Sequence, residues 1–471
     1  MAGLIVSRLW PALALLGFLF TSAGVGAGPA AEHLAAAVRF PTVSHQHPGK
    51  LDSEAFNRLH RFFRSTYPET FARLKVEVVN GYSLLLEWPG QDSALAPVLF
   101  TAHMDVVPVE PGTAGDWSHP PFAGVIENGV IYGRGTLDDK LGVISLLEAV
   151  ERLLQQGFAP QRSLFFGFGH DEEIGGVQGA GAIAQRFRER GLYFSWMLDE
   201  GGYIISDNPL LPERQVALVG VAEKLYLTLL LKTRGAGGHS SRPPPTTTIG
   251  RLAAAVVRVE NNPFPAKIVP PIDTMLTRSA QHMEFPMSFL FGNLWLTEPL
   301  VARILGDDQV SSSFVRTTTA ATMFNAGVKE NVIPQAAEAR INFRLLPGDT
   351  PEMVLAHVTR VVDDPEVEIS ALPREGARAP VAAMEGGGFE VISRATRSVY
   401  RDVVMLPYMM PATTDVRHYV DLADNHYRFH GALISMGQAE QVHGTNEQLA
   451  VESFEQTVAV AVAILEAAGQ P

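Results

Sequence analysis

The segment from residue 96 to residue 202 constrains the fold most strongly, because apolar runs and amphipathic runs alternate along it. The apolar runs are APVLFTAH, SLFFGFG and YFSWMLDEGG, each of strand length. Between them, LGVISLLEAVERLLQQG and GAGAIAQRFRERG place apolar residues at helical spacing and stop at a glycine. This β-α-β-α-β order predicts an α/β fold with a mostly parallel sheet and helices on both of its faces.

A second pattern begins near residue 223. The strand KLYLTLLLKT is followed by a helix over residues 249–259, two strands, a helix over residues 351–362 and the strand VEISAL. The β-α-β-β-α-β order is typical of a small α+β unit with helices on one sheet face. We therefore predict a first domain formed by residues 28–222 and 379–471, with a second domain inserted as residues 223–378. We expect the apolar stretch over residues 265–305 to extend the inserted domain.

Composition excludes several kinds of site and partner. The 471 residues include no cysteine, so any metal must be held by His, Asp and Glu. The net charge of −13 argues against a nucleic-acid partner. Residues 1–27 place Arg8 before the apolar run LWPALALLGFLF and small residues, as secretory signals do. We expect a secreted or periplasmic protein, or a membrane-anchored one if this segment is not cleaved.

Ionisable side chains stand where the predicted strands end, which is where parallel sheets bind ligands. HMDVVPV places His103 and Asp105 two residues apart on an extended chain, so the carboxylate can orient the imidazole. FGHDEEIGG follows the next strand and contains Glu172 and Glu173, and LDEGG ends the third. Carboxylates this dense at a strand end repel one another unless a cation neutralises them.

Two further motifs add to this set. YGRGTLDDKLG places Asp138 and Asp139 before a helix, and QVHGTNE places His443 in a polar loop. Taken alone, each motif is better explained as a helix cap, a polar turn or an exposed loop. Taken together, two histidines and several carboxylates without cysteine are the ligands of an oxygen-rich zinc site.

The ordered motifs TAHMDVVPV, GRGTLDDK, DEEIGG, LDEGG, GGHSSRPP, NVIP and HGTNE resemble a known family. This is the co-catalytic zinc metallopeptidase family of carboxypeptidase S, aminoacylase and succinyl-diaminopimelate desuccinylase. WLTEPL, RTTTA, AGVKENVIP and INFRLLPG resemble its carboxypeptidase S branch, which includes secreted enzymes that make and hydrolyse N-fatty-acyl amino acids. The resemblance covers nearly the whole chain after residue 27. It implies that the inserted domain is a lid that also mediates dimerisation.

The resemblance implies a set of metal ligands. Two zinc ions per subunit, which cobalt or manganese can replace, would be held by His103, Asp138, Glu173, Asp199 and His443. Asp138 would bridge the two ions, with His103 and Asp199 on one side and Glu173 and His443 on the other. Glu200 is the alternative to Asp199.

The resemblance also implies catalytic and substrate-binding residues. Asp105 would orient His103, Glu172 would be the general base, and His239 would stabilise the tetrahedral intermediate, reaching across a homodimer or by hinge closure. Asn331, Arg344 and Arg417 would hold the substrate. An arginine that faces a substrate carboxylate would require a free carboxyl group.

The expected function is hydrolysis of an amide bond next to a free carboxylate in a small molecule or peptide. The enzyme would be a Gly-X-type carboxypeptidase or an N-acyl-amino-acid hydrolase. A deacylase or esterase that acts on other substrates, and a non-catalytic binding protein on the same scaffold, are the alternatives. The sequence leaves the acyl group, the side-chain preference and the direction of the reaction open.

Overall fold

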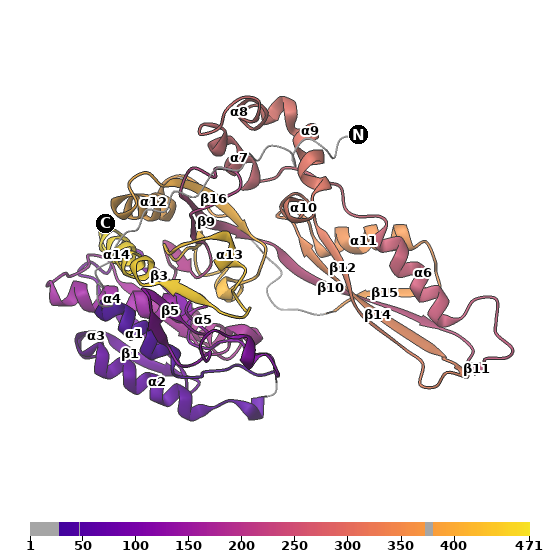
Figure 1. Ribbon diagram of the computed structural model, residues 1–471, viewed down its shortest axis with the longest axis horizontal. Helices are drawn as coiled ribbons and strands as arrows, with labels where there is room; N and C mark the ends of the chain where they lie inside the picture. Colours follow the sequence, from indigo (N-terminus) through magenta and orange to yellow (C-terminus); the bar gives the residue numbers. More distant parts are fainter. Residues whose placement is uncertain (1–27, 47, 373–379) are drawn as a thin grey trace.

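The computed structural model describes residues 28–46, 48–372 and 380–471, so the expected signal segment lies outside it. Its largest sheet contains β1 (Lys75–Val79), β2 (Ser83–Trp88), β3 (Val98–His103), β6 (Leu164–Gly169), β7 (Trp196–Asp199), β8 (Ile204–Ile205), β9 (Val216–Glu223), β16 (Val404–Met410), β17 (His426–Arg428) and β18 (Leu433–Ile434). The strand order is β1-β2-β6-β3-β7-β17-β9-β8-β18, with β16 paired to β9 (Figure 1). The central strands β6, β3, β7 and β17 run parallel.

Helices cover both faces of this sheet, as the alternating sequence pattern predicted. One face carries α1 (Pro29–Val38), α2 (Ser53–Thr66), α3 (Pro68–Arg73), α4 (Lys140–Gln155), α12 (Gly387–Val399) and α14 (Val451–Ala468). The other face carries α5 (Ala180–Glu189). Phe100 and Phe166 pack towards α4, whereas Leu99 and Phe165 pack towards α5. Neighbouring strand residues point to opposite faces, so strands buried on both sides are apolar throughout.

A second sheet has the predicted β-α-β-β-α-β order. It contains β10 (Leu225–Arg234), β12 (Thr318–Ala326), β14 (Ala336–Leu345) and β15 (Val367–Ala371), in the antiparallel order β12-β14-β10-β15. The helices α6 (Thr248–Glu260) and α11 (Pro351–Val362) share its apolar core. At the far tip of this unit, β11 (Gly238–His239) pairs with β13 (Val332–Ile333) (Figure 1). The exact domain boundaries stay a prediction, and the one at 378 lies outside the described residues.

The apolar stretch over residues 265–305, which we expected to extend the inserted domain, adds no strand to the second sheet and packs instead beside β16. It forms α7 (Ile272–Ala280), α8 (Met287–Gly292) and most of α9 (Leu294–Asp307), which are followed by α10 (Gln309–Val315). Ile272, Leu276 and Phe291 share a buried cluster with Val404 and Leu406 of β16. These helices therefore cover an edge of the large sheet, beside β16 in Figure 1. Within the described part of the chain, no helix is both long and apolar enough to cross a membrane.

Candidate metal centre

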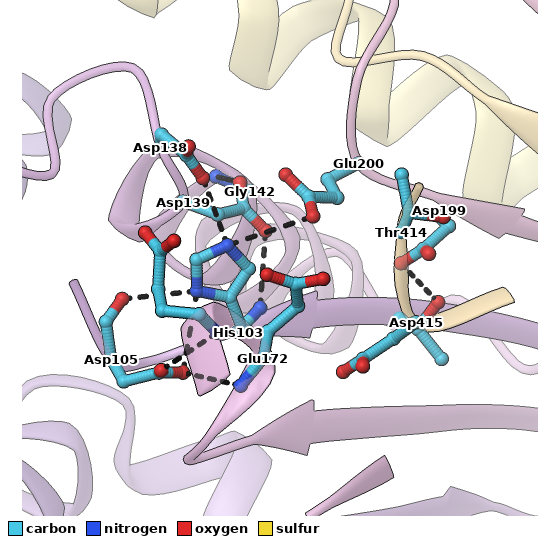
Figure 2. Close-up of polar contacts among 12 residues, drawn as sticks. His103, Asp105, Asp138, Asp139, Gly142, Glu172, Asp199, Glu200, Thr414 and Asp415 are labelled. Atoms are coloured by element: carbon cyan, nitrogen blue, oxygen red, sulfur yellow. Dashed lines mark hydrogen bonds and ion pairs between the residues drawn. The ribbon is translucent and has the colours of Figure 1, made fainter. Parts of the chain in front are cut away.

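The candidate ligands converge where strands of the large sheet end (Figure 2). His103 ends β3, Glu173 lies in the turn after β6, and Glu200 follows β7. β3 and β6 are paired in register up to His103 and Gly169, so their following loops start side by side. Asp138 lies just before α4. The fifth candidate ligand, His443, lies in the loop that precedes β19 (Gln448–Ala450). The strand β19 joins β5 (Val130–Tyr132) and β4 (Val125–Glu127) in a three-stranded sheet.

Asp138 stands between two histidines and uses one carboxylate oxygen for each. His103 Nε2 lies 2.8 Å from Asp138 Oδ1 and 3.6 Å from Glu200 Oε1. His443 Nε2 lies 2.9 Å from Asp138 Oδ2 and 3.1 Å from Glu173 Oε2. Each histidine therefore forms a group with two carboxylates, and the two groups share Asp138. Four of the five expected ligands are in this arrangement.

The electrostatics of this cluster favour a positive charge at its centre. Burial alone would raise the pKa of Asp138, but hydrogen bonds from His103 and His443 lower it well below its ordinary value. Hydrogen bonds to Asp138 and Glu173 raise the pKa of His443 to about 10. Burial, with the nearby charge of Asp138, raises the pKa of Glu200 to about 8. A divalent cation supplies the missing positive charge more fully than protons do.

In the LDEGG stretch, the carboxylate that lies beside His103 is that of Glu200, not that of the expected Asp199. Asp199 Oδ1 accepts a hydrogen bond from Thr101 Oγ1 at 2.6 Å, and Asp199 belongs to none of the candidate metal groups among the described residues. Neighbouring residues at a strand end point to opposite faces, so only one of this pair can face His103. Gly201 has φ +124°, and a Cβ at Gly202 would lie 1.9 Å from a main-chain oxygen, so the turn that carries Glu200 needs both glycines.

Asp105 has more contacts than the sequence predicted. Its main-chain oxygen accepts a hydrogen bond from His103 Nδ1 at 3.0 Å, and its carboxylate lies 3.4 Å from the same atom. The carboxylate also accepts hydrogen bonds from Ser44 Oγ at 2.6 Å and from the amides of Glu172 and Glu173 at 3.2 Å. One buried aspartate thus orients the imidazole and fixes the loop that carries the expected base.

Glu172 points towards this cluster and contacts an arginine. Its Oε1 accepts a hydrogen bond from Arg417 Nη2 at 3.5 Å, and both side chains are largely buried. Burial, with the charges of Asp415 and Glu200, raises the pKa of Glu172 well above its ordinary value. A carboxyl group whose pKa is raised towards neutral pH is suited to accept a proton and return it.

Asp139 caps a helix, as its position before α4 suggested. Its Oδ1 accepts a hydrogen bond from the Gly142 amide at 3.0 Å, and its Oδ2 accepts one from the His103 amide at 3.1 Å. Asp139 also lies 3.3 Å from His430 Nε2, and these two residues form a third candidate group with Glu200. Because both Asp139 oxygens already accept main-chain hydrogen bonds, we regard this residue as structural.

The expected residues of the second sheet divide into two places. His239 and Asn331 lie together at its far tip, where the Ser240 amide donates to the Asn331 oxygen at 3.2 Å. This tip lies away from β3 and is not brought to the metal ligands within one chain (Figure 1). Arg344 instead reaches back towards the first domain: its Nη1 donates to Thr413 Oγ1 at 3.4 Å, close along the chain to Arg417.

A buried ion pair that sequence reasoning missed joins the two ligand loops. Arg134 Nη1 donates to Glu447 Oε2 at 2.8 Å, and Arg134 Nη2 donates to the main-chain oxygens of His443 and Gly444 at 3.2 and 2.9 Å. Glu447 Oε1 accepts hydrogen bonds from the main-chain amides of residues 135, 137 and 138 at 3.0, 2.6 and 3.3 Å. The pair therefore connects the loop of Asp138 with the loop of His443.

The geometry agrees with comparisons to known proteins. Residues 99–467 match Peptidase family M20/M25/M40. The chain belongs to this family. It is accordingly a hydrolytic enzyme, and the expected family, branch and fold class are confirmed.

Two relatives of this M20 enzyme cover most of its length. Probable carboxypeptidase S-like 2 of Dictyostelium discoideum is 40% identical over 91% of this chain and 83% of its own. The N-fatty-acyl-amino acid synthase/hydrolase PM20D1 of Bos taurus is 37% identical over 91% of this chain and 85% of its own.

Solved structures share the fold at lower identity. The M20 metallo-carboxypeptidase Sso-CP2 from Sulfolobus solfataricus has a TM-score of 0.69 at 18% identity, covering 94% of this chain and 99% of its own. The Bacillus subtilis YXEP protein, a dinuclear metal binding M20 peptidase, has a TM-score of 0.56 at 14% identity, covering 93% of this chain and 98% of its own. At these identities the likeness concerns the fold.

Proposed function

We propose that this M20 enzyme is a dinuclear metal hydrolase that cleaves an amide bond next to a free carboxylate. Its substrates would be blocked dipeptides or N-acyl amino acids. The observation that carries the proposal is the position of Asp138, whose two oxygens each face one histidine at 2.8 and 2.9 Å. A carboxylate placed in this way suits a bridge between two ions.

The residues of the cluster fit two divalent ions. His103, Glu200 and Asp138 would hold one ion, and His443, Glu173 and Asp138 the other. Glu173 Oε1 is buried and has no hydrogen-bond partner among the described residues, as expected of an oxygen reserved for a cation. Zinc suits imidazole and carboxylate ligands, and cobalt or manganese can replace it. When bound, the ions supply Lewis acidity towards water and towards the amide carbonyl.

The side chains around the cluster would handle the protons and the substrate. Glu172 takes a proton from the attacking water and returns it to the leaving nitrogen, so that the C–N bond breaks to give a carboxylate and an amine. Arg417, 3.5 Å from Glu172, and Arg344 would bind the substrate carboxylate beside the reacting carbonyl. Asn331 would reach the substrate only together with His239 from the lid tip.

The names of the relatives support this substrate class. A carboxypeptidase substrate and an N-acyl amino acid share one chemical feature, an amide whose nitrogen side carries a free carboxylate. One relative is named as a carboxypeptidase S-like protein and the other as an N-fatty-acyl-amino acid synthase/hydrolase. We therefore favour this amide over esters or other acyl substrates.

The far tip of the second sheet supports a dimeric active site. His239 is exposed at β11 and lies away from its own metal ligands (Figure 1). We propose that the second sheet belongs to a lid and that His239 serves the active site of a second copy in a homodimer. We also propose a secreted or periplasmic enzyme, on the strength of the N-terminal sequence alone.

The test is hydrolysis by the zinc-loaded full chain, followed by mass spectrometry. The panel contains a blocked Gly-Leu dipeptide, N-oleoyl-phenylalanine, the amide-capped form of each and a simple acyl ester. We expect cleavage of the two free acids, loss on chelation, recovery with zinc, and loss in Glu172→Gln but not in the surface control Glu189→Gln. Equal cleavage of the capped forms or of the ester, or no cleavage at all, would refute the proposal.

A further inference from the structure

Four arginines line a cavity of about 430 Å³ at the amino end of β16. Arg278 comes from α7, Arg397 from α12, Arg401 from the turn after α12, and Arg214 from the loop before β9. Asp402 is the one carboxylate among the residues that line the cavity. In a chain of net charge −13, this concentrates positive charge at one place on the surface.

Three of these guanidinium groups are available to a ligand. Arg278 is engaged, because its Nη2 donates to the Met384 main-chain oxygen at 2.7 Å and it lies over an aromatic ring. Arg214, Arg397 and Arg401 are exposed, and none of them has a side-chain hydrogen bond or ion pair with another described residue. Unpaired guanidinium groups that line one cavity are suited to an anion with several oxygens.

An apolar cavity of about 400 Å³ adjoins the arginines. The two cavities share the lining residues Arg214 and His282, so they lie next to each other. Most residues that line the second cavity are apolar, among them Met283, Met287, Phe291 and Phe285, which is 81% exposed, and the carboxylates of Glu213 and Glu284 also line it. Phe285 and Met287, which is 41% exposed, present neighbouring apolar side chains at this surface. Exposed apolar side chains that are grouped in this way mark binding surfaces.

We propose that the two cavities form one binding site for a phosphate-headed amphiphile with a single long acyl chain. The phosphate would lie among Arg214, Arg397 and Arg401, and the acyl chain would lie along the apolar cavity. A phosphate fits this head site of three arginines better than a fatty-acid carboxylate does, because a phosphate monoester offers three acceptor oxygens and nearly two negative charges, against two oxygens and one charge. The site shares no lining residue with the metal centre and does not depend on the proposed reaction.

The binding test uses the full chain and isothermal titration calorimetry with 1-oleoyl lysophosphatidate below its micelle concentration. Glycerol 3-phosphate supplies the head alone, monooleoylglycerol the chain alone, and oleate a single carboxylate on the same chain. We expect lysophosphatidate to bind at least about tenfold more tightly than each of the three, because each of them lacks one part of the recognition. Equal affinity for lysophosphatidate and monooleoylglycerol would overturn the proposal, and so would equal affinity for glycerol 3-phosphate.

Variants locate the binding. Arg397→Gln with Arg401→Gln should raise the Kd for lysophosphatidate about tenfold or more, and Phe285→Ser should raise it separately. Arg394→Gln is the matched control, since Arg394 lies on the same helix, pairs with Glu390 at 3.7 Å and does not line the cavity. An unchanged Kd in the double variant, or an equal rise in the control, would refute the site. Loss of binding on zinc chelation would place the lipid at the metal centre and would also refute it.

Discussion

Replacing Arg134 by Met tests whether one ion pair holds the two halves of the metal centre together. The Arg134 side chain is 3% exposed and that of Glu447 is 0% exposed, so the substitution leaves a buried carboxylate without its cation. Removing one partner of a buried pair costs about 3–5 kcal/mol of unfolding free energy. The variant also loses the hydrogen bonds to the main-chain oxygens of His443 and Gly444.

The substitution should affect metal binding as well as stability. Because Arg134 holds the loop of His443 against the loop of Asp138, its loss should loosen the ion bound by His443 more than the ion bound by His103. Removing a residue that holds a metal ligand in place typically weakens metal affinity by about 10- to 100-fold. We therefore expect the weaker of two zinc binding steps to fall by about that factor, while the other step changes little.

Two assays separate these effects. Urea unfolding of the chelated protein gives the stability loss, and competition with a zinc-binding dye gives the two affinities. Arg188→Met is the control, because Arg188 pairs with Asp421 at 2.6 Å but both side chains are exposed. Its expected loss of unfolding free energy is about 0–1 kcal/mol. A loss below about 1 kcal/mol in Arg134→Met, with unchanged zinc affinities, would refute the role of the ion pair. If Arg134→Met does not fold, Arg134→Lys serves with a smaller expected loss.

Three further predictions concern the ligands, the pH dependence and the dimer. Glu200→Gln should reduce the zinc content after dialysis from two ions per chain to one, whereas Asp199→Asn should retain both, and equal losses would contradict the choice of Glu200. Burial lowers the pKa of His426 to about 4, compared with 6.5 in the unfolded chain. The neutral imidazole therefore contributes its full share of the unfolding free energy above pH 6.5, and this contribution is lost as the pH falls towards 4. Between about pH 7 and pH 5, the unfolding free energy measured by urea titration should therefore fall less in His426→Gln than in the unmodified protein. An equal fall in both proteins would show that His426 is not the source of this pH dependence. His239→Ala and Glu172→Gln should each be inactive with normal zinc content. Mixing the two variants should restore activity, because one active site of each heterodimer then has both an intact Glu172 and an intact His239 from the partner. No recovery after subunit exchange would exclude a histidine supplied by the partner.

The sequence predicted the elements whose pattern is local. The runs that became β3, β6 and β7 are apolar on both faces, and α4 begins after the capping Asp139 and ends near Gly157, as its spacing indicated. His103 and Glu173 also lie at or after the ends of these strands, where the sequence placed them. Such features depend on neighbours along the chain, which a single sequence contains.

The differences between expectation and structure concern contacts that a single sequence does not specify. Asp199 and Glu200 are adjacent, and the choice between them depends on the last residue of β7 and on the turn at Gly201 and Gly202. Arg134 and Glu447 are 313 residues apart, and no local signal pairs them. The apolar stretch of α7–α9 lies within the inserted domain in sequence, but its buried side chains, such as Leu276 and Phe291, pack with residues of β16.

The most direct test of the proposed metal centre is the anomalous scattering of zinc in crystals of the zinc-loaded chain. We predict two peaks per subunit, both beside the carboxylate of Asp138, with His103 and Glu200 on one ion and His443 and Glu173 on the other. A single peak, or a peak bound by Asp199 with Glu200 turned away, would contradict this account.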